Sequence, residues 1–487
     1  MAFVIILDIF VVGLLYVAGV TRGFERALPV ATFLLILFPN ESQIPIPGFL
    51  DITTQRLIVF TLIALYFQFG RSPEDGGPVN KLPIAGLLIL QIIWMVVATV
   101  NSVVFTVSLK STLSQLLDFF TVFYLYAKGV RSTDTIHRIL RGFVGAMLFL
   151  SVFAFIEYYF DWSLLSLFPV VGHRFNVNSD IYDRIDRVRT TFGHPILFGG
   201  ALAMAIPAAL YLIRISKSKA GQIGFSLGIG LMFWAIYKTD SRGPWLALLL
   251  SCVAMVFFGG KQLRKYLLII ALVVATTLVV RPGIYTSLEN MYVATKDPDS
   301  PMGSSYQWRY TLYDLVKAQL GKNPARAVWG YGPESFYYLG LTTDFYLDGE
   351  VRTVKVESCD SSVAALMMET GYLGFAITAL LLLAPLWIAI RGYFAASEDR
   401  KPLLVLFICN MGAYFFLMTN VAIYGWGQQT YILWVILAMA SIYPTVVKAE
   451  AARESESTEP APLEPAPRVW GTAQALQSGQ YQPKWNA

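Results

Sequence analysis

Two arginines stand beside long apolar segments, where a positive charge is costly unless it meets an anion, a carboxylate or water. Arg189 lies in "RVRTTFGHP" and Arg242 lies in "KTDSRGPW". A guanidinium group stays charged at any relevant pH and binds anionic oxygens through two parallel hydrogen bonds. We therefore expect both arginines to bind an anionic group at the edge of the apolar segments. For Arg189 the alternative is an ion pair with Asp186, three residues earlier, and for Arg242 it is extension of the side chain to lipid headgroups.

Two further arginines precede the first of these, and their spacing gives them a different role. Asp180 lies four residues before Arg184, and Asp183 lies four residues before Arg187. On a helix such pairs face each other and attract. The stretch "SDIYDRIDRV" is therefore predicted to be a short amphipathic helix whose arginines are paired within it.

Carboxylates surround the start of a late apolar segment. Glu357 and Asp360 precede this segment, and Glu369 lies inside it. A carboxylate placed just outside such a segment is able to act as a general base. The alternatives are structural: Asp360 caps the helix that follows, and Glu369 packs near the next glycines. Asp118, inside another apolar segment, is either functional or a hydrogen-bond partner between helices.

The remaining residues that could bind a ligand or react predict no metal or nucleotide site. His137, His173 and His194 are scattered without the spacing of metal ligands. The three cysteines form no disulfide framework. The stretch "AVWGYGPESF" predicts a turn whose glycine backbone can approach a ligand closely, but it lacks the spacing of a phosphate-binding nucleotide loop. We therefore expect no metal and no cofactor.

The elements that must position these residues are membrane-spanning helices. Hydrophobic residues make up 56% of the chain and charged residues only 14%, against about 25% charged residues in a soluble domain. The apolar residues form long blocks, so we expect an all-α polytopic membrane protein with about 12–13 transmembrane helices. The expected spans are 3–20, 24–39, 55–70, 82–100, 113–127, 139–160, 195–213, 222–238, 244–259, 266–280, 362–390, 402–419 and 429–447.

Basic residues predict which loops face the cytoplasm. Six alternate connections carry seventeen Lys and Arg residues, and loops rich in these residues stay in the cytoplasm. The net charge of +5 has this origin and gives no reason to expect nucleic acid as a partner. The tail 448–487 is also cytoplasmic and is expected to be disordered, because it is rich in Glu, Pro and Ala. The other expected parts are an N-terminal bundle 1–160, an outward loop 161–194, helices 195–280, a second outward loop 281–361 and helices 362–447.

The second outward loop is too long to be a simple connection and is expected to form a domain between late helices. Within it, "SSYQWRYTLYDLVKAQLGKNP" predicts a helix. Ser304 and Gln307 match a capping box, and Gly321 follows as a stop. Arg309 then lies in the first turn of this helix.

Four stretches in this order resemble the O-antigen ligase and polymerase superfamily of bacterial inner-membrane glycosyltransferases. They are "RTTFGHPILFGGALAMAIP", "DSRGPWLALLLS", "WRYTLYDLVKAQLGKNPARAVWGYGPESF" and "DSSVAALMMETGYLGFAITALLLL". The resemblance runs from about Arg189 to the last span. It implies a multi-helix GT-C-like fold and an active site that faces the periplasm. It also implies undecaprenyl-diphosphate-linked oligosaccharides as substrates, membrane lipids as surroundings and catalysis without a metal.

Carried over residue by residue, the arginines of the family match Arg189, Arg242 and Arg309. The resemblance implies that these side chains bind the diphosphate and stabilise it as it departs. Together with Glu357 they are the expected substrate-binding residues. Arg242, Arg309 and Asp360 are the expected catalytic residues, with Asp360 as a base or as the group that orients the acceptor hydroxyl. An aspartate with its ordinary pKa of about 3.9 is a weak base, so Glu357 competes for this role.

One departure from the family favours one of two activities. The lipid A ligases carry a histidine nine residues before a glutamate, whereas the residue nine before Glu369 is Asp360. Polymerase-like members show aspartate there, so we expect polymerisation of undecaprenyl-diphosphate-linked repeats into O-antigen or exopolysaccharide. The first alternative is a ligase that transfers lipid-linked glycan to lipid A-core or another acceptor. The second is a membrane transporter or lipid-linked glycan flippase. The partners to expect are a glycan acceptor, a separate flippase and a chain-length regulator.

Overall fold

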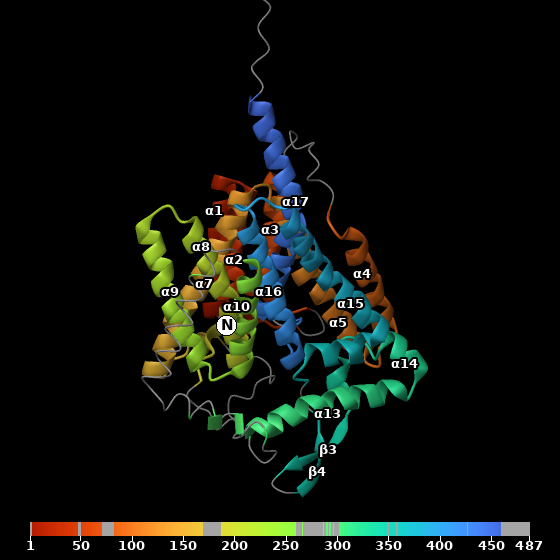
Figure 1. Cartoon of the computed structure of the whole chain (residues 1–487). Coiled ribbons are helices and arrows are strands. Elements are labelled where there is room, and N and C mark those ends of the chain that lie inside the picture. Colours follow the sequence, from red (N-terminus) through yellow and green to blue (C-terminus); the bar gives the residue numbers. More distant parts are fainter. Residues whose placement is uncertain are drawn as a thin grey trace, which may run out of the picture.

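Twelve of the thirteen expected spans coincide with helices in the computed structural model of the chain (Figure 1). The thirteenth, 266–280, lies outside the described residues. Seven described helices are long and apolar enough to cross a membrane, and three shorter helices are also apolar. The chain is therefore an all-α polytopic membrane protein, as the sequence predicts.

The structure describes residues 2–46, 50–70, 82–168, 187–259, 301–347, 350–356, 359–425 and 427–458, with isolated positions between 265 and 296. The first group of α-helices is α1 (Ala2–Arg22), α2 (Phe24–Leu37), α3 (Thr54–Phe69), α4 (Ala85–Val100), α5 (Phe105–Gln115), α6 (Thr121–Gly129) and α7 (Thr133–Phe160). The second group is α8 (Pro195–Ile215), α9 (Lys219–Lys238), α10 (Arg242–Phe258), α13 (Pro301–Gly321), α14 (Pro324–Trp329), α15 (Ser362–Ala395), α16 (Lys401–Asn420) and α17 (Gly427–Thr458).

Shorter elements connect the helices and were not predicted. A π-helical turn, η2 (Leu116–Phe120), joins α5 to α6, and the 3-10 turns are η3 (Leu164–Leu167), η4 (Thr190–Phe192) and η5 (Ser335–Tyr338). Two antiparallel hairpins pair β1 (Gln43–Ile44) with β2 (Ile52–Thr53) and β3 (Thr342–Leu347) with β4 (Glu350–Lys355). In the second hairpin Thr342 is opposite Lys355. The long outward loop therefore contains strands as well as helices.

Three helices form the interior of the bundle. In the spans of α8, α16 and α17, 83%, 78% and 83% of the residues are buried, against 28% in α1 and in α9. Glycines allow α8 to approach its neighbours closely. A Cβ atom on Gly199 would lie 2.7 Å from Pro244 of α10, and one on Gly200 would lie 2.8 Å from Leu417 of α16. These contacts bring the starts of α8 and α10 next to the end of α16.

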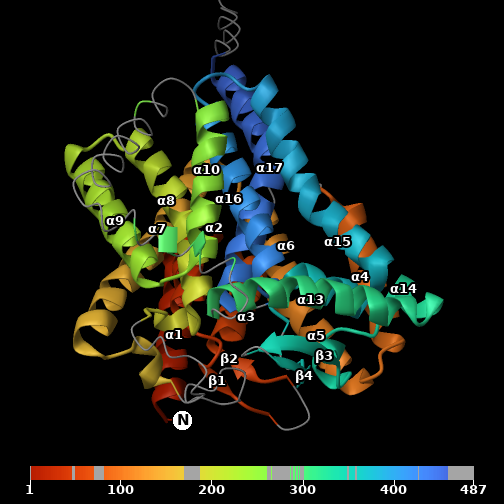
Figure 2. The ribbon, with the colours of Figure 1, turned by 60° about the horizontal axis from the view of Figure 1, so that its bottom comes forward.

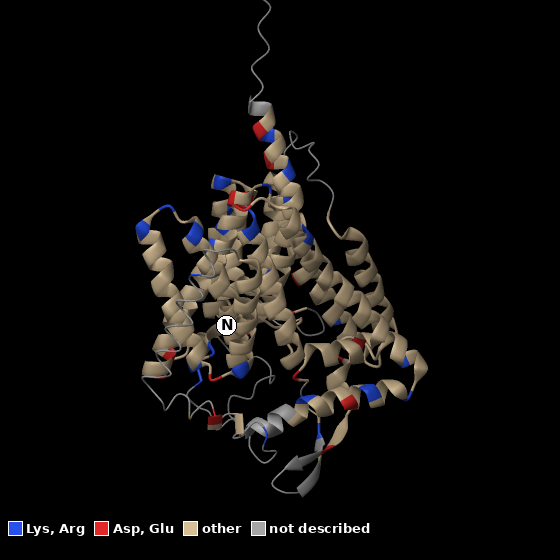
Figure 3. Ribbon diagram, in the orientation of Figure 1, with Lys and Arg blue, Asp and Glu red and all other residues tan. Residues whose placement is uncertain are grey.

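Charged residues gather toward the two ends of the bundle and are sparse between them (Figure 3). The connections α1–α2, α8–α9 and α15–α16 lie at the same end as the C-terminal part of α17 (Figures 1 and 2). Helix α13 lies across the opposite end, and the hairpin β3–β4 projects beyond it. The arrangement agrees with the alternation of basic and less basic loops along the chain.

Helix α13 differs from its prediction at one end. It begins at Pro301, before the predicted cap at Ser304, and it ends at Gly321 as predicted. Proline favours the first position of a helix because its missing N–H is not needed there and its φ is already helical. The capping-box prediction is therefore wrong, whereas the glycine stop is confirmed.

Candidate active site

A cavity of about 990 Å³ lies at the end of the bundle where several loops meet. Its walls come from the segment 40–56, from α5 and η2, and from the turn 189–193. The C-terminal half adds 333–338, the start of α15 and 422–431. The volume is at the upper end of the range of about 300–1,000 Å³ that is usual for ligand pockets. The cavity is therefore the candidate site of the molecule.

The predicted site residues divide into two groups. Arg189 lines the cavity. Among the described lining residues, Arg242, Arg309 and Asp360 do not appear, and Glu357 lies outside the described residues. The three arginines nevertheless belong to neighbouring segments. The starts of α8 and α10 pack against the end of α16, and α13 is hydrogen-bonded to that same end.

The turn η4, just after Arg189, is anchored by helices that are distant in the sequence. Thr190 N–H donates to Glu157 Oε2 on α7 at 2.9 Å, and Gln428 Nε2 on α17 donates to Thr191 O at 2.8 Å. The Glu157 carboxylate also attracts Arg189 electrostatically. The backbone next to Arg189 is thus fixed from two sides at the cavity wall.

Arg187 holds the turn between α9 and α10, which the sequence did not predict. Its Nε donates to Thr239 O at 2.8 Å, and its Nη2 donates to Ser241 Oγ at 2.6 Å. Arg242 follows directly and begins α10. The backbone at Arg187 is not helical, so the predicted short helix does not extend to it, and residues 179–186 of that prediction lie outside the described residues. Arg187 therefore connects its own segment to the start of α10.

His194 and Glu41 are partly buried near the same turn. The Nδ1 atom of His194 accepts a backbone N–H from the start of α8 at 3.2 Å. Burial, together with Arg187 and Arg189, lowers the pKa of His194 to about 4, so the imidazole is neutral at neutral pH. Burial raises the pKa of Glu41, which lines the cavity beside Gly193. His194 therefore adds no positive charge next to Arg189.

Arg309 and Asp360 are neighbours at the end of α16. Arg309 Nε donates to Asn420 O at 3.0 Å. Burial lowers the pKa of Arg309 and the Asp360 carboxylate raises it, so the two groups lie within electrostatic range. The N-cap of α15 is Ser361, whose Oγ accepts the Ala364 N–H at 3.3 Å. The alternative role of Asp360 as the cap of this helix is therefore wrong.

Helix α15 is broken at Gly371, where φ is 72°, and the predicted glycine turn fills the break. Tyr331 N–H donates to Met368 O at 3.0 Å, and Gly332 N–H donates to Glu369 O at 2.8 Å. Backbone groups beside a break need such partners when they are away from water. The loop and the helix therefore form one interlocked unit.

Close backbone contact explains Gly330 in this turn. A Cβ atom on Gly330 would lie 2.4 Å from Glu369 O, a distance that no larger residue tolerates. The turn was predicted to approach a ligand, and in the structure it approaches another helix. As a result, Glu334 (φ 62°), Tyr337 and Glu369 line the cavity.

Another wall of the cavity carries a buried ion pair between Asp118, which the sequence singled out, and Arg56, which it did not. Arg56 Nε donates to both carboxylate oxygens of Asp118 at 3.1 Å, and its Nη2 donates to Asp118 at 2.9 Å and to Ser114 Oγ at 2.8 Å. Its Nη1 donates to Asp51 O, and Lys110 Nζ lies 3.2 Å from Asp51 Oδ2. Asp118 thus has a partner on another helix and also lines the cavity. The available signal was an arginine in the first turn of an apolar span.

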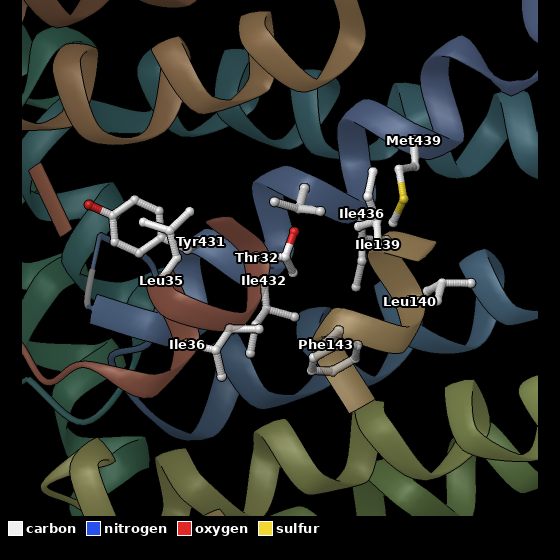
Figure 4. A pocket seen from close by; sticks show the side chains of 11 residues that line it. Thr32, Leu35, Ile36, Ile139, Leu140, Phe143, Tyr431, Ile432, Ile436 and Met439 are labelled. Carbon is white, nitrogen blue, oxygen red and sulfur yellow. The ribbon is translucent and has the colours of Figure 1, made fainter. Parts of the chain in front are cut away.

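Other features of the described residues lack the chemistry of a ligand site. A cavity of about 10 Å³ lies among α2, α7 and α17 (Figure 4). It holds at most about one water molecule, and its lining is almost entirely apolar, with Thr32 as an exception. Within the described parts of the chain, no three His, Cys, Asp or Glu side chains are grouped so that they could hold a metal ion.

Comparison with known families gives one match. Residues 227–379 match a family model described as O-antigen ligase. The matched part runs from α9 into α15 and contains Arg242, Arg309, Asp360 and Glu369. Arg189 and the wall formed by α3 and α5 lie outside it. No curated protein matches the chain.

Proposed function

The chain belongs to the O-antigen ligase and polymerase superfamily, and on this premise we propose that it joins undecaprenyl-diphosphate-linked oligosaccharide repeats into O-antigen or exopolysaccharide. The family gives the reaction class, which is transfer of a glycan by a membrane enzyme. The observation that carries the proposal is Arg189 on the wall of a cavity of about 990 Å³. The cavity is at the end of the bundle away from the basic connections, which supports a site that faces the periplasm of the inner membrane.

The proposed reaction is a single displacement with inversion. A hydroxyl oxygen of the acceptor sugar forms a bond to the anomeric carbon of the donor, and the bond from that carbon to the diphosphate oxygen breaks. The hydroxyl proton passes to a carboxylate, and undecaprenyl diphosphate leaves with the bonding electron pair. Arg189, Arg242 and Arg309 stabilise the negative charge that develops on the diphosphate. Guanidinium groups supply this stabilisation, so the mechanism that we propose uses no metal and no cofactor.

Several carboxylates are candidates for the base. Asp360 is proposed as the base or as the group that orients the acceptor, and Glu357 is its competitor. Glu334 and Glu369 join them because both line the cavity in which the acceptor would lie. A base must reach the acceptor hydroxyl directly or through one water molecule, and this requirement favours the lining residues.

The surroundings of the enzyme follow from its substrate. The exposed apolar faces of the spans contact membrane lipids and are suited to the polyprenyl chain. A flippase that delivers lipid-linked repeats and a chain-length regulator are proposed partners. The predicted disordered tail 448–487 is helical as far as Thr458, because α17 continues to that residue, so the prediction of disorder is wrong for 448–458. The tail begins at the end with the basic connections and is proposed to be cytoplasmic.

A ligase is the second candidate, because the matched family model is described as O-antigen ligase. A ligase would transfer finished glycan from the lipid carrier to lipid A-core or another acceptor. Deletion of the gene separates the two activities. Loss of a polymerase leaves single repeats on the final acceptor, whereas loss of a ligase leaves polymer on the lipid carrier.

The proposal is tested with arginine variants in the deletion strain. Arg189→Ala is expected to abolish the ladder of polymer lengths, and Arg242→Ala and Arg309→Ala are expected to shorten it or abolish it. The matched control is Arg214→Ala, which removes an arginine from the last turn of α8, at the opposite end of the helix that follows Arg189. A normal ladder in the Arg189→Ala strain, at a protein level equal to wild type, would contradict the proposal.

A further inference from the structure

Helix α5 presents a polar face to the cavity. The lining positions of α5 recur at intervals of three and four residues, which places them on one side of a helix. They are Thr106, Val107, Lys110, Ser111, Ser114 and Gln115. Leu109 and Leu113, on other sides of α5, are exposed. Polar side chains are rare in an apolar bundle unless they meet water or a polar ligand, so this face is suited to either of the two.

The cations on this wall, Arg56 and Lys110, are already paired within the protein. Arg56 Nη2 lies 2.9 Å from Asp118 Oδ2, and Lys110 Nζ lies 3.2 Å from Asp51 Oδ2. A cation that is held against a carboxylate has little net attraction left for a distant anion, because the two fields nearly cancel. The wall is therefore suited to a neutral polar ligand and not to a diphosphate.

Ser111 and Gln115 keep hydrogen-bonding capacity on this face. Gln115 Nε2 donates to Ser111 Oγ at 3.5 Å. In the part of the chain that the structure describes, the Ser111 hydroxyl hydrogen and Gln115 Oε1 take part in no other hydrogen bond. A donor and an acceptor thus lie side by side. A sugar hydroxyl both donates and accepts, so it matches this pair.

The cavity also has more room than a diphosphate requires. Its volume of about 990 Å³ exceeds that of two phosphate groups several-fold. Seventeen of its 34 lining residues precede position 120, and fourteen of those seventeen have polar or charged side chains. Tyr337, Tyr338 and Tyr424 add aromatic rings with a polar tip. Such a lining is suited to the sugar rings of a glycan, because these rings carry many hydroxyl groups.

Resting on the function proposed above, we propose that the polar face of α5 and the segment 40–56 form the glycan subsite of the cavity. They bind the hydroxyl groups of the lipid-linked oligosaccharide, while Arg189 binds its diphosphate. The preference of the enzyme for a particular repeat then resides in the N-terminal part of the chain, outside the family match at 227–379.

The test uses full-length protein in lipid nanodiscs and two probes. One probe is undecaprenyl diphosphate without sugar, and the other is the lipid-linked single repeat extracted from the deletion strain. Ser111→Leu and Gln115→Leu remove the hydrogen-bonding groups from the face of α5. Ser226→Leu makes the same exchange on the exposed surface of α9 and is the matched control. Dissociation constants are measured for each probe.

Each α5 variant is expected to weaken binding of the lipid-linked repeat at least about tenfold and to change binding of the bare lipid less than about twofold. Arg189→Ala weakens both, and Ser226→Leu changes neither. Equal effects of the α5 variants on both probes, or none on either, overturn the glycan subsite. If a leucine variant does not fold, Thr106→Val gives the same readout from an exposed position on this face. A wild-type protein that binds neither probe overturns the proposed function itself.

Discussion

Each guanidinium nitrogen of Arg56 donates a hydrogen bond inside an apolar bundle. Its ion pair with Asp118 leaves 11% and 10% of the two side chains exposed. Removal of two ions from water costs several kcal/mol for each, and the attraction of the pair offsets this only if the remaining polar atoms are also satisfied. At the scale of the residue, the main effect of the pair is therefore to fix the position of α3 against η2. Its net contribution to the free energy of unfolding is small.

Arg56→Ala is expected to lower the free energy of unfolding by about 3–5 kcal/mol, because Asp118 loses its partner and stays buried. The double variant Arg56→Met with Asp118→Leu is expected to recover most of this loss, since apolar side chains replace both ions. Thermal unfolding of the protein in detergent measures both changes. A double variant as unstable as Arg56→Ala would show that the ion pair itself stabilises the fold.

At the scale of the element, the break in α15 separates two tasks within one helix. The part before Gly371 lines the cavity, and the part after it continues through the bundle. Backbone groups at a break within a membrane-spanning helix need partners in the protein or in a water-filled cavity. Two of the carbonyls at the break accept from the glycine turn, and Trp94 Nε1 donates to Thr370 O at 2.9 Å. Hydrogen bonds from two other segments thus stabilise the non-helical backbone at the break.

Gly371→Ala is expected to disturb this junction. The residue has a φ of 72°, and a Cβ atom would lie 2.2 Å from Val328 O. Strain in the backbone alone costs about 1–3 kcal/mol, and the clash adds to it, so we expect a lower unfolding temperature and loss of the polymer ladder. The control is Gly412→Ala in α16, where no atom lies within 4 Å and alanine favours the helix by about 1 kcal/mol. Equal behaviour of the two variants would refute the role of the junction.

Apolar length predicted the helices, because a bilayer demands about 20 apolar residues for each crossing. It did not predict the break at Gly371, since a glycine in an apolar run leaves the run continuous. Arg189 was predicted from a positive charge at the edge of such a run. The pair of Arg56 and Asp118 was not, because the two residues are 62 positions apart and only the packing of α3 against η2 brings them together.

At the scale of the whole molecule, the cavity draws on segments from residue 40 to residue 431. The family match covers only 227–379, so the part with the clearest relationship to other proteins makes less than half of the cavity wall. The segment 40–56, α5 with η2, and the segment 422–431 supply most of the rest. The sidedness of the membrane insertion therefore decides whether the cavity meets substrate.

Reporter fusions test this sidedness. Alkaline phosphatase inserted between β3 and β4 is expected to be active, because the hairpin lies at the end that we assign to the periplasm, where the enzyme forms its disulfides. The same reporter fused after residue 458 is expected to be inactive, while a fluorescent protein fused there is bright. Phosphatase activity at both positions, or at neither, would contradict the assigned orientation.

The interlock of Gly330 with the broken α15 also limits which substitutions the chain can accept during evolution. A side chain at Gly330 meets the backbone of α15, and a side chain at Gly371 meets the backbone before Gly330. Because each obstacle is main chain, no compensating side-chain substitution can make room. We expect proteins that evolve from this chain to keep both glycines or to change the junction in one step by insertion or deletion. The two positions are therefore expected to change together.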